Sequence, residues 1–392
     1  MHFKKTALTL GLAAALCSGA VWADEGEGHA IPRLDHVFVI VMENQIYGHI
    51  YGNPDAPFIN GLATTANLAT NYYGVGHPSL TNYLEIVGGS NFGIENDNSP
   101  AWHSNCKSSL EAGVPALGNS SLLACPIKGS GTDAATLAQD PNQSSNIVYN
   151  IPIPAAPAVA QTIADQLVAA GLSYKSYQES LPPYGADGVN ISDGLLSDVT
   201  GGFPSTTSPG APSGTPHLYA VKHNPFVYFA NVQAGTDPRN SLANSVGFER
   251  LYADLSSGHV PNYSFIVPNQ CHDQHGRGSG EVGPYCQTTP DHDLILSGDQ
   301  AVESIVGAIK ASRAWDEGKN AIVVVWDEND YSVNANQVVA IVDTNYGVHG
   351  TTSNVAYNHF SLLKTIEAGF GLPCLNHACD SNVDVMSDLF AR

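Results

Sequence analysis

The chain has 392 residues, of which 43% are hydrophobic and 13% are charged, and its formal net charge at pH 7 is −21. This length and apolar content suffice for a large buried core, in one large domain or two. The negative charge argues against a nucleic-acid-binding protein and against adhesion to anionic lipid, since both require a positive surface. A phosphorylated substrate would need local positive charge, most simply a metal ion.

The N-terminus has the pattern of a secretory signal peptide. Lys4 and Lys5 form a positive start, Ala7–Cys17 is an apolar run, and Val21–Ala23 supplies a cleavage signal. We therefore expect residues 1–23 to be removed and the protein to be exported, either to the periplasm or to the extracellular space. No later apolar run is long enough to span a bilayer, so the sequence predicts no stable membrane anchor.

Six of the seven cysteines remain after the signal peptide. An even number in an exported protein favours disulfide bonds. Sequence alone does not select among the possible pairings, but proximity favours three local pairs: Cys106–Cys125, Cys271–Cys286 and Cys374–Cys379. The competing interpretation is a cysteine-rich zinc site, and the lack of any CxxC pair argues against it.

Predicted strands and helices alternate along the chain. Apolar runs predict strands at His36–Met42, Leu172–Gln178, Pro225–Phe229, Tyr263–Val267, Ala321–Trp326 and Val338–Val342. Helices are expected at Pro57–Tyr72, Ala158–Gly171, Ser241–Ser256, Asp299–Arg313 and His359–Phe370, and Leu84–Val87 suits either a helix or a strand. This alternation predicts an α/β fold with a mostly parallel sheet.

We expect one elaborated domain over residues 24–392, because neither an internal repeat nor a clean linker divides the chain. Residues 91–150 are rich in Asn, Ser, Gly and Pro, and residues 199–216 are rich in Ser, Gly, Pro and Thr. Both segments are predicted to be long loop excursions from the domain, since such compositions are typical of surface loops.

Two of the most apolar predicted strands end in polar pairs. Glu43 and Asn44 follow HVFVIVM, and Asp327 and Glu328 follow AIVVVW. The carboxyl ends of parallel strands meet at one edge of a sheet, which is where open α/β sheets place ligands. Carboxylate and amide oxygens converging there would suit a divalent cation. The alternative is that both pairs are ordinary turn or helix-capping residues.

The segment HPSLTNY follows a glycine-rich approach and contains a candidate nucleophile. Ser79 could attack an ester if a metal ion lowered its pKa. Asn82 lies one helical turn later and could donate its amide to a phosphoryl oxygen. A lone serine in such a turn is also typical of a helix N-cap, which is the simpler interpretation of this segment on its own.

Histidines group in two segments, with His223 in KHNPF and both His272 and His275 in PNQCHDQHG. Histidine can bind a metal, hydrogen-bond an anion or act as a general acid toward a leaving group. The HxxH spacing suggests zinc only weakly. His359 could be a helix-end histidine, whereas His292 and His349 are expected at the surface.

Eight segments in order resemble the bacterial phosphoesterase family of acid phosphatases and phospholipases C, within the alkaline-phosphatase-like superfamily. The segments are VIVMENQ, HPSLTNYLEIVGG, IADQLVAAGLSYKSYQESLP, KHNPFVYF, PNQCHDQHG, GDQAVESIVGAI, VVVWDEND and NHFSLLKTIE. They span residues 35–370. The resemblance implies a three-layer αβα sandwich and hydrolysis of phosphate esters through a covalent phosphoryl-enzyme.

The resemblance also implies a metal site. It assigns Ser79 as the nucleophile and places it with Glu43, Asn44, Asp327 and Glu328 around a divalent cation. One cation is expected, because the additional Asp and His ligands of two-zinc members are not matched in this chain. Its identity is left open among Ca²⁺, Mg²⁺, Mn²⁺ and Zn²⁺, since oxygen ligands suit all four.

For the substrate, the resemblance assigns Asn82 as the phosphate-binding amide. It assigns His223 and His272 as phosphate ligands or as proton donors to the leaving oxygen, with His275 as a further substrate contact. Thr81 departs from the family pattern, because related sequences often have proline there. This departure should alter the turn slightly without altering the chemistry.

We therefore expect a small phosphorylated substrate, and phosphate monoesters in particular. Phospholipase-type relatives often carry further C-terminal domains, and this chain ends soon after the predicted helix at His359–Phe370. The first alternative is a phospholipase C that cleaves phosphodiester bonds of zwitterionic lipids. A second alternative is a non-catalytic secreted cation-binding protein, which the 8% aromatic content and lack of repeats support poorly.

Overall fold

The computed structural model describes residues 31–92, 94, 97, 161–181, 218–276, 286–289 and 291–391. The expected signal peptide, the expected pair Cys106–Cys125 and the excursion at residues 199–216 lie outside the described residues, as does most of the excursion at 91–150. Among the described residues, no helix has the length and apolar character needed to cross a membrane.

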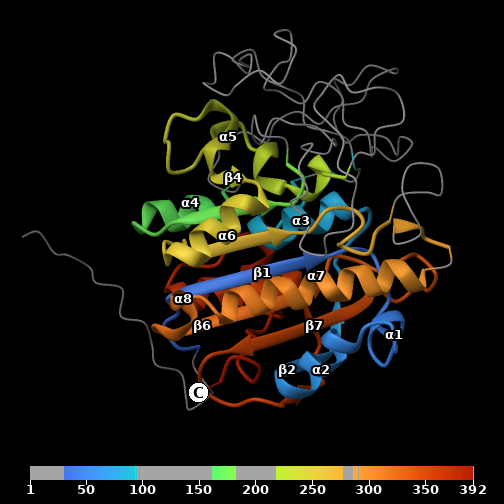
Figure 1. The fold of residues 1–392 in the computed structure, drawn as a ribbon. Helices are drawn as coiled ribbons and strands as arrows, with labels where there is room; N and C mark the ends of the chain where they lie inside the picture. Colours follow the sequence, from blue (N-terminus) through green and yellow to red (C-terminus); the bar gives the residue numbers. More distant parts are fainter. Residues whose placement is uncertain are drawn as a thin grey trace, which may run out of the picture.

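A nine-stranded sheet runs through the centre of the described residues (Figure 1). Its strands are β1 (His36–Met42), β2 (Asn67–Tyr73), β3 (Tyr174–Gln178), β4 (Ser245–Val246), β5 (Tyr263–Val267), β6 (Asn320–Trp326), β7 (Gln337–Thr344), β8 (Thr352–Ser353) and β9 (Tyr357–Asn358). The order is β4-β3-β5-β1-β6-β7-β2-β8, and β9 also pairs with β2. Only β7 runs antiparallel to its neighbours, β6 and β2, so the prediction of a mostly parallel sheet is confirmed.

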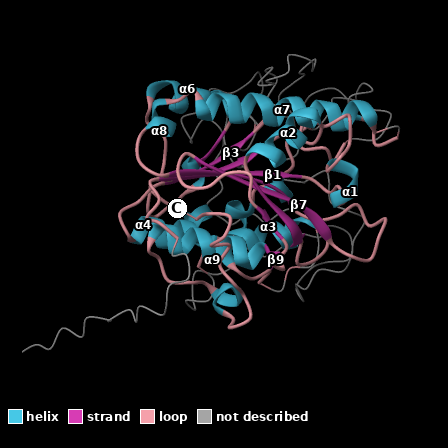
Figure 2. Cartoon of the chain, turned by 90° about the horizontal axis from the view of Figure 1, so that it is seen from below, coloured by secondary structure: helices cyan, strands magenta, loops and turns pink. Residues whose placement is uncertain are grey.

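Helices cover both faces of this sheet. They are α1 (Tyr47–Ile50), α2 (Pro57–Thr65), α3 (Ser79–Gly88), α4 (Ile163–Ala169), α5 (Ala230–Ala234), α6 (Phe248–Ser257), α7 (His292–Lys310), α8 (Arg313–Asp316) and α9 (His359–Phe370). Figure 2 shows α2, α6, α7 and α8 on one face and α3, α4 and α9 on the other. The three-layer αβα prediction is therefore confirmed.

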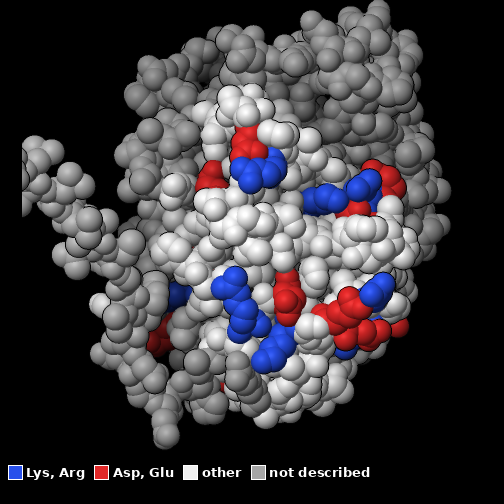
Figure 3. Space-filling view, turned by 90° about the vertical axis from the view of Figure 1, so that its left-hand side faces the viewer, with Lys and Arg blue, Asp and Glu red and all other residues white. Residues whose placement is uncertain are grey.

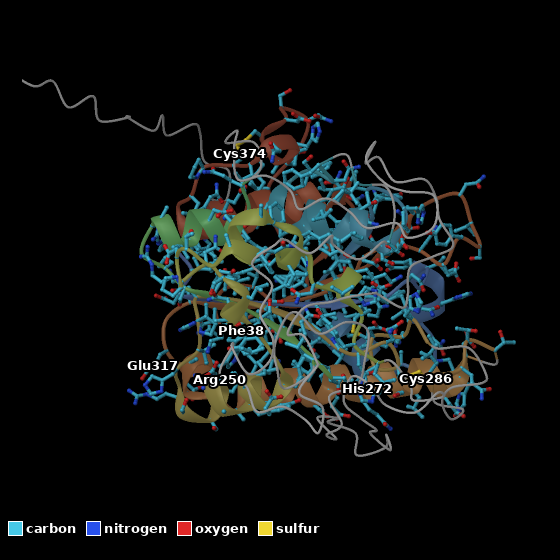
Figure 4. All side chains as sticks on the ribbon, turned by 90° about the horizontal axis from the view of Figure 1, so that it is seen from above. Phe38, Arg250, His272, Cys286, Glu317 and Cys374 are labelled. Carbon is cyan, nitrogen blue, oxygen red and sulfur yellow. A yellow bond between two sulfur atoms is a disulfide. The ribbon has the colours of Figure 1, made fainter. Side chains whose placement is uncertain are left out.

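The central strands are buried on both faces, which explains their continuous apolar sequences. Every residue of β6 is buried, and so is every residue of β1 after His36. Figure 4 shows Phe38 of β1 in the interior and Glu317 at the edge of the molecule. On the face shown in Figure 3, acidic and basic side chains lie in small mixed groups separated by uncharged surface.

Several predicted elements differ from the structure. The helix predicted at Asp299–Arg313 begins earlier, at His292, and ends at Lys310. The helix predicted at Pro57–Tyr72 ends at Thr65, and the strand Asn67–Tyr73 follows it. The strand predicted at Pro225–Phe229 is a 3-10 helix, Pro225–Tyr228. The predicted helix at Ser241–Ser256 begins only at Phe248. For Asn67–Tyr73, the local pattern failed because pairing with β7, a tertiary contact, decides the local structure.

Two disulfide bonds lie within the described residues, Cys271–Cys286 and Cys374–Cys379. These are two of the pairings that sequence proximity favours. Figure 4 shows His272 and Cys286 close together, because Cys286 is bonded to the neighbour of His272. This disulfide therefore closes a loop beside one of the predicted substrate-binding histidines.

Candidate active site

The pairing of β1 with β6 brings the two acidic pairs together. The two strands are parallel, with Met42 opposite Trp326, so the residues that follow leave the sheet side by side. The backbone N–H of Asp327 donates to the carbonyl of Met42 at 3.0 Å. Glu43, Asp327 and Glu328 are all buried. The edge of the sheet thus gathers three carboxylates from segments almost three hundred residues apart.

Ser79 is the first residue of α3 and faces these carboxylates. Its Oγ lies 3.0 Å from Oε2 of Glu43 and 3.2 Å from Oε1 of Glu328. The N-cap position of α3 is occupied by Pro78, so the Ser79 side chain is not the helix cap. The hydroxyl instead points at two acidic groups, each of which can accept its proton.

Asn82 lies one turn further along α3 and hydrogen-bonds the backbone of the segment that precedes Ser79. Its Nδ2 donates to the carbonyl of Gly76 at 2.9 Å and to Oε2 of Glu328 at 3.2 Å. Its Oδ1 accepts from the backbone N–H groups of Val75 and Gly76. These contacts hold the chain that leads into the nucleophile. The predicted contact between the Asn82 amide and phosphate stays a prediction.

The side chain of His223 lies next to the carboxylate of Glu43. Its Nε2 is 3.1 Å from Oε1 of Glu43, and its Nδ1 is 3.3 Å from Oδ2 of Asp273, although neither contact is aligned as a hydrogen bond. The ring stacks on Tyr83 with centroids 5.0 Å apart. Burial, together with the neighbouring Lys222, lowers the pKa of His223 well below its usual range. The imidazole is therefore neutral and can accept or donate one hydrogen bond at each nitrogen according to its tautomer.

His272 has a carboxylate partner that the sequence analysis did not single out. Both carboxylate oxygens of Glu179 lie 2.9 Å from Nδ1 of His272. The backbone N–H of Asn269 donates to the same carboxylate at 2.9 Å. Within the described residues, no hydrogen bond joins His272 to Ser79. Its predicted role as a phosphate ligand or proton donor stays a prediction.

His275 and Asn44, two further predicted site residues, lie at the border of this cluster. The His275 ring centroid is 6.0 Å from that of His223, and its backbone N–H donates to Asp273 at 2.7 Å. Asn44 is half-buried and directly follows Glu43. Both are adjacent to the carboxylates, and the predicted ligand role of Asn44 and the predicted substrate contact of His275 stay predictions.

Burial of several acids in one place changes their protonation. Burial raises the pKa of Glu43 to about 8, with nearby Lys222 acting against this shift and nearby Glu328 adding to it. Burial also raises the pKa values of Asp327 and Asp273, and the charge of Glu43 adds to both shifts. Without a counter-charge, burial therefore favours the protonated form of these carboxyl groups.

The oxygen atoms of this cluster fit a divalent cation. Both carboxylate oxygens of Asp327, Oε1 of Glu43 and Oδ2 of Asp273 are buried without a hydrogen-bond partner. Buried carboxylates are normally paired or coordinate metals, and hard oxygen ligands suit Ca²⁺, Mg²⁺ and Mn²⁺. Across the part of the chain that is described, no group of three or more His, Cys, Asp or Glu side chains is already arranged as a metal site.

Other functional contacts escaped the sequence analysis. His77 Nδ1 lies 2.6 Å from Oε2 of Glu328, and its place in HPSLTNY was the available signal. Asp97 accepts the backbone N–H of Leu80 at 3.0 Å and pairs with Lys222 at 2.8 Å, which fixes the start of α3. Asp97 lies in a loop without a recognisable pattern, so only the fold could place it there.

The remaining histidines have distinct surroundings. His359 begins α9 and is fully buried, with its Nε2 2.5 Å from the carbonyl oxygen of Asp327. Burial lowers the pKa of His359 to about 4, so the ring is neutral and supports the backbone of the β6 end. The His292 and His349 side chains are 59% and 43% exposed, as the sequence predicted.

Comparisons with known proteins identify the family of the chain. The phosphoesterase family matches residues 50–373. The chain is 26% identical over 385 residues to the phosphatidylinositol-3-phosphatase of Mycobacterium tuberculosis, covering 97% of this chain and 91% of that protein. It is 26% identical over 363 residues to a probable acid phosphatase of Kluyveromyces lactis, covering 91% of this chain and 62% of that protein.

A third relative is the phosphate-repressible acid phosphatase of Penicillium chrysogenum, which is 24% identical and covers 83% of this chain and 57% of that protein. The chain thus spans less than two thirds of both fungal relatives. A solved structure of a Vibrio parahaemolyticus protein in the alkaline phosphatase superfamily has 12% identity and a TM-score of 0.45, covering 88% of this chain and 68% of that one. The chain belongs to the phosphoesterase family and is a phosphoric ester hydrolase.

Proposed function

We propose that the protein hydrolyses phosphate monoesters through a phosphoserine intermediate formed on Ser79. The observation that carries this proposal is the position of the Ser79 hydroxyl between the carboxylates of Glu43 and Glu328, at 3.0 and 3.2 Å. A serine hydroxyl needs a base or a cation to become a nucleophile, and this position offers two acceptors for its proton. The phosphatase names of the relatives support the monoester as the substrate class.

One divalent cation belongs to this proposal. Glu43, Asp327, Glu328 and Ser79 would hold it, with Asn44 beside them, and the unpartnered buried oxygens of Asp327 support this assignment. When bound, such an ion lowers the pKa of a coordinated hydroxyl and offsets negative charge that develops on a phosphoryl group.

Side chains of the protein then transfer the protons of the reaction. Ser79 Oγ gives its proton to a neighbouring carboxylate and forms a bond to phosphorus, while the bond from phosphorus to the leaving alcohol breaks. The alcohol takes a proton from a histidine. The resemblance implies His223 or His272 for this step, and the lowered pKa of His223 favours His272. His77 is a further candidate, because its side chain is 33% exposed while it holds Glu328. Water then hydrolyses the phosphoserine.

Replacing the nucleophile tests the proposal. Ser79→Ala should lower the turnover of p-nitrophenyl phosphate by about 10³-fold or more, since removing a catalytic serine abolishes covalent catalysis. Ser256→Ala is the matched control, because Ser256 is an exposed serine of α6 whose hydroxyl contacts only its own helix. Near-wild-type turnover by Ser79→Ala would refute the assignment.

The substrate class is tested by a second assay. We expect p-nitrophenyl phosphate to be hydrolysed and p-nitrophenyl phosphorylcholine to be hydrolysed poorly. The reverse preference would favour the phospholipase C alternative. The non-catalytic alternative is set aside, since the chain belongs to a family of enzymes.

Export is also part of the proposal. The basic, apolar and cleavage regions at residues 1–23 support it, as do the disulfides Cys271–Cys286 and Cys374–Cys379, which persist in oxidising compartments. N-terminal sequencing of protein recovered from the periplasm and from the medium tests this point. A mature chain starting near residue 24 is expected, and an intact N-terminus on cytoplasmic protein would contradict it.

A further inference from the structure

An exposed aromatic side chain lies beside the candidate site. Tyr331 follows the end of β6 by five residues, and its 57% exposure is the highest among the large apolar side chains that the structure describes. Its φ is +62°, a conformation that bulky residues rarely adopt. Such backbone conformations persist where the surroundings impose them, and they concentrate at functional sites.

The loop that carries Tyr331 is held by its own side chains. Asn329 Nδ2 donates to the carbonyls of Val333 and Ala335 at 2.9 and 2.8 Å, and Asn329 Oδ1 accepts the backbone N–H of Tyr331 at 2.9 Å. Asp330 lies 3.2 Å from Nδ1 of His49 in α1, which ties the loop to a second element. The tyrosine is therefore presented in a fixed position.

Tyr331 contacts the nucleophile cluster directly. Its ring centroid lies 4.2 Å from that of His77, at an interplanar angle of 32°. Its hydroxyl is 3.4 Å from Oε1 of Glu328, the same oxygen that lies 3.2 Å from Ser79 Oγ. The exposed Tyr331 and the proposed nucleophile Ser79 therefore contact the same carboxylate oxygen of Glu328.

We propose that the tilted, closely packed pair of Tyr331 and His77 binds the leaving-group side of the substrate and selects flat aromatic alcohols over aliphatic ones. This inference rests on the monoesterase function proposed above. A planar ring can pack against this pair, since offset or edge-to-face ring pairs gain energy beyond the area that they bury. A saturated ring of similar size buries similar area but lacks this gain.

The test uses two substrates that differ in flatness and hardly in reactivity. Benzyl phosphate and cyclohexylmethyl phosphate release alcohols of similar acidity, so the chemical step is matched. In Tyr331→Ala, we expect KM for benzyl phosphate to rise about two- to tenfold, the range that an aromatic pair supports. We expect KM for cyclohexylmethyl phosphate, and kcat for both, to change by less than about twofold.

Two further variants separate the ring from other effects. Tyr331→Phe retains the ring and should keep the wild-type ratio of the two KM values. Tyr51→Ala removes the other exposed tyrosine among the described residues, which pairs with Tyr47 in α1, and should also leave both KM values unchanged.

Several results would overturn the proposal. An equal rise of KM for both substrates in Tyr331→Ala would show a structural role of the loop. A defect in Tyr331→Phe as large as that in Tyr331→Ala would assign the effect to the hydroxyl. If the wild-type enzyme hydrolyses neither ester, the monoesterase function fails. Calorimetric binding of benzylphosphonate against cyclohexylmethylphosphonate then still decides whether Tyr331 selects flat groups.

Discussion

Ser79 Oγ lies 3.0 Å from Oε2 of Glu43, although the two residues are 36 positions apart in the chain. The contact exists because β1 ends at Met42 while α3 begins at Ser79 on the same edge of the sheet. The contact links the carboxylate that follows β1 to the hydroxyl of the first residue of α3. The predictions below follow from this junction and from the buried acids around it.

Removal of the Glu43 carboxylate should impair catalysis while the fold is retained. We expect Glu43→Gln to lower kcat by about 10²-fold or more, because the variant loses both a partner of Ser79 and a cation ligand. Glu303→Gln, on the exposed face of α7, is the matched control. Steady-state kinetics and far-UV circular dichroism provide the two readouts, and unchanged kcat in a folded Glu43→Gln protein would contradict the assignment.

Cation removal should affect both activity and stability. Dialysis against a chelator is expected to abolish turnover, and return of a divalent cation should restore it. A ligand present at 100 times its Kd adds about 2.7 kcal/mol to the free energy of unfolding. We therefore expect added cation to raise the Tm of the wild type but not that of Asp327→Asn. A cation-induced rise in Tm that is the same in both proteins would place the binding site elsewhere.

Glu179 should act as a positioning residue for His272. Its carboxylate holds Nδ1 of that ring at 2.9 Å, so it fixes which nitrogen carries the proton. Glu179→Gln should lower kcat by about 10- to 100-fold, the range for such supporting partners. The pH profile of kcat should shift as well, whereas a purely structural role would lower activity uniformly with pH.

Stability should depend on pH through Glu367 of α9. Burial raises its pKa to about 9, although the backbone of Leu375, the side chain of Gln166 and the charge of Lys364 act against this shift. The folded-state pKa therefore exceeds the unfolded value near 4.5, so this contribution to stability is fully present below pH 4.5 and is lost as the pH rises toward 9. Glu367→Gln should flatten the fall in unfolding free energy between pH 5 and about pH 9.

Denaturant unfolding at several pH values measures how the free energy of unfolding depends on pH in Glu367→Gln and in the wild type. Glu303→Gln again serves as the control, because an exposed glutamate has little reason to change the slope. The informative quantity is the difference between variant and wild type in the slope of unfolding free energy against pH. The buried acids near Ser79 contribute a slope of the same sign to both proteins, so their contribution cancels in this difference. A wild-type slope in Glu367→Gln would show that Glu367 is ionised in the folded protein.

The sequence predicted the centre of the fold better than its edges. The strands at Tyr263–Val267 and Ala321–Trp326 are apolar on both faces, so their sequences identify them without tertiary information. The helix His359–Phe370 was also predicted with its exact ends. Its start is marked by Asn358, which accepts the N–H of Ser361, and its end by Gly371 at φ +68°.

The missed features depend on contacts that a sequence pattern does not encode. The strand Asn67–Tyr73 is only partly apolar and becomes a strand because it pairs with Gln337–Thr344. Glu179 reaches His272 because β3 lies beside β5, and nothing in its local sequence marks this contact. Family-like motifs predicted Ser79 together with Glu43 and Glu328, whereas the contacts of Asp97 and Glu179 required the fold.

The central claim is that Ser79 carries the phosphoryl group during turnover. The most direct measurement is to quench the enzyme with acid during hydrolysis of a phosphate-labelled monoester and to map the labelled peptide by mass spectrometry. The account predicts phosphate on Ser79 of the wild type and none on Ser79→Ala. Active enzyme that carries no covalent phosphate under these conditions, or carries it on a histidine, would contradict the account.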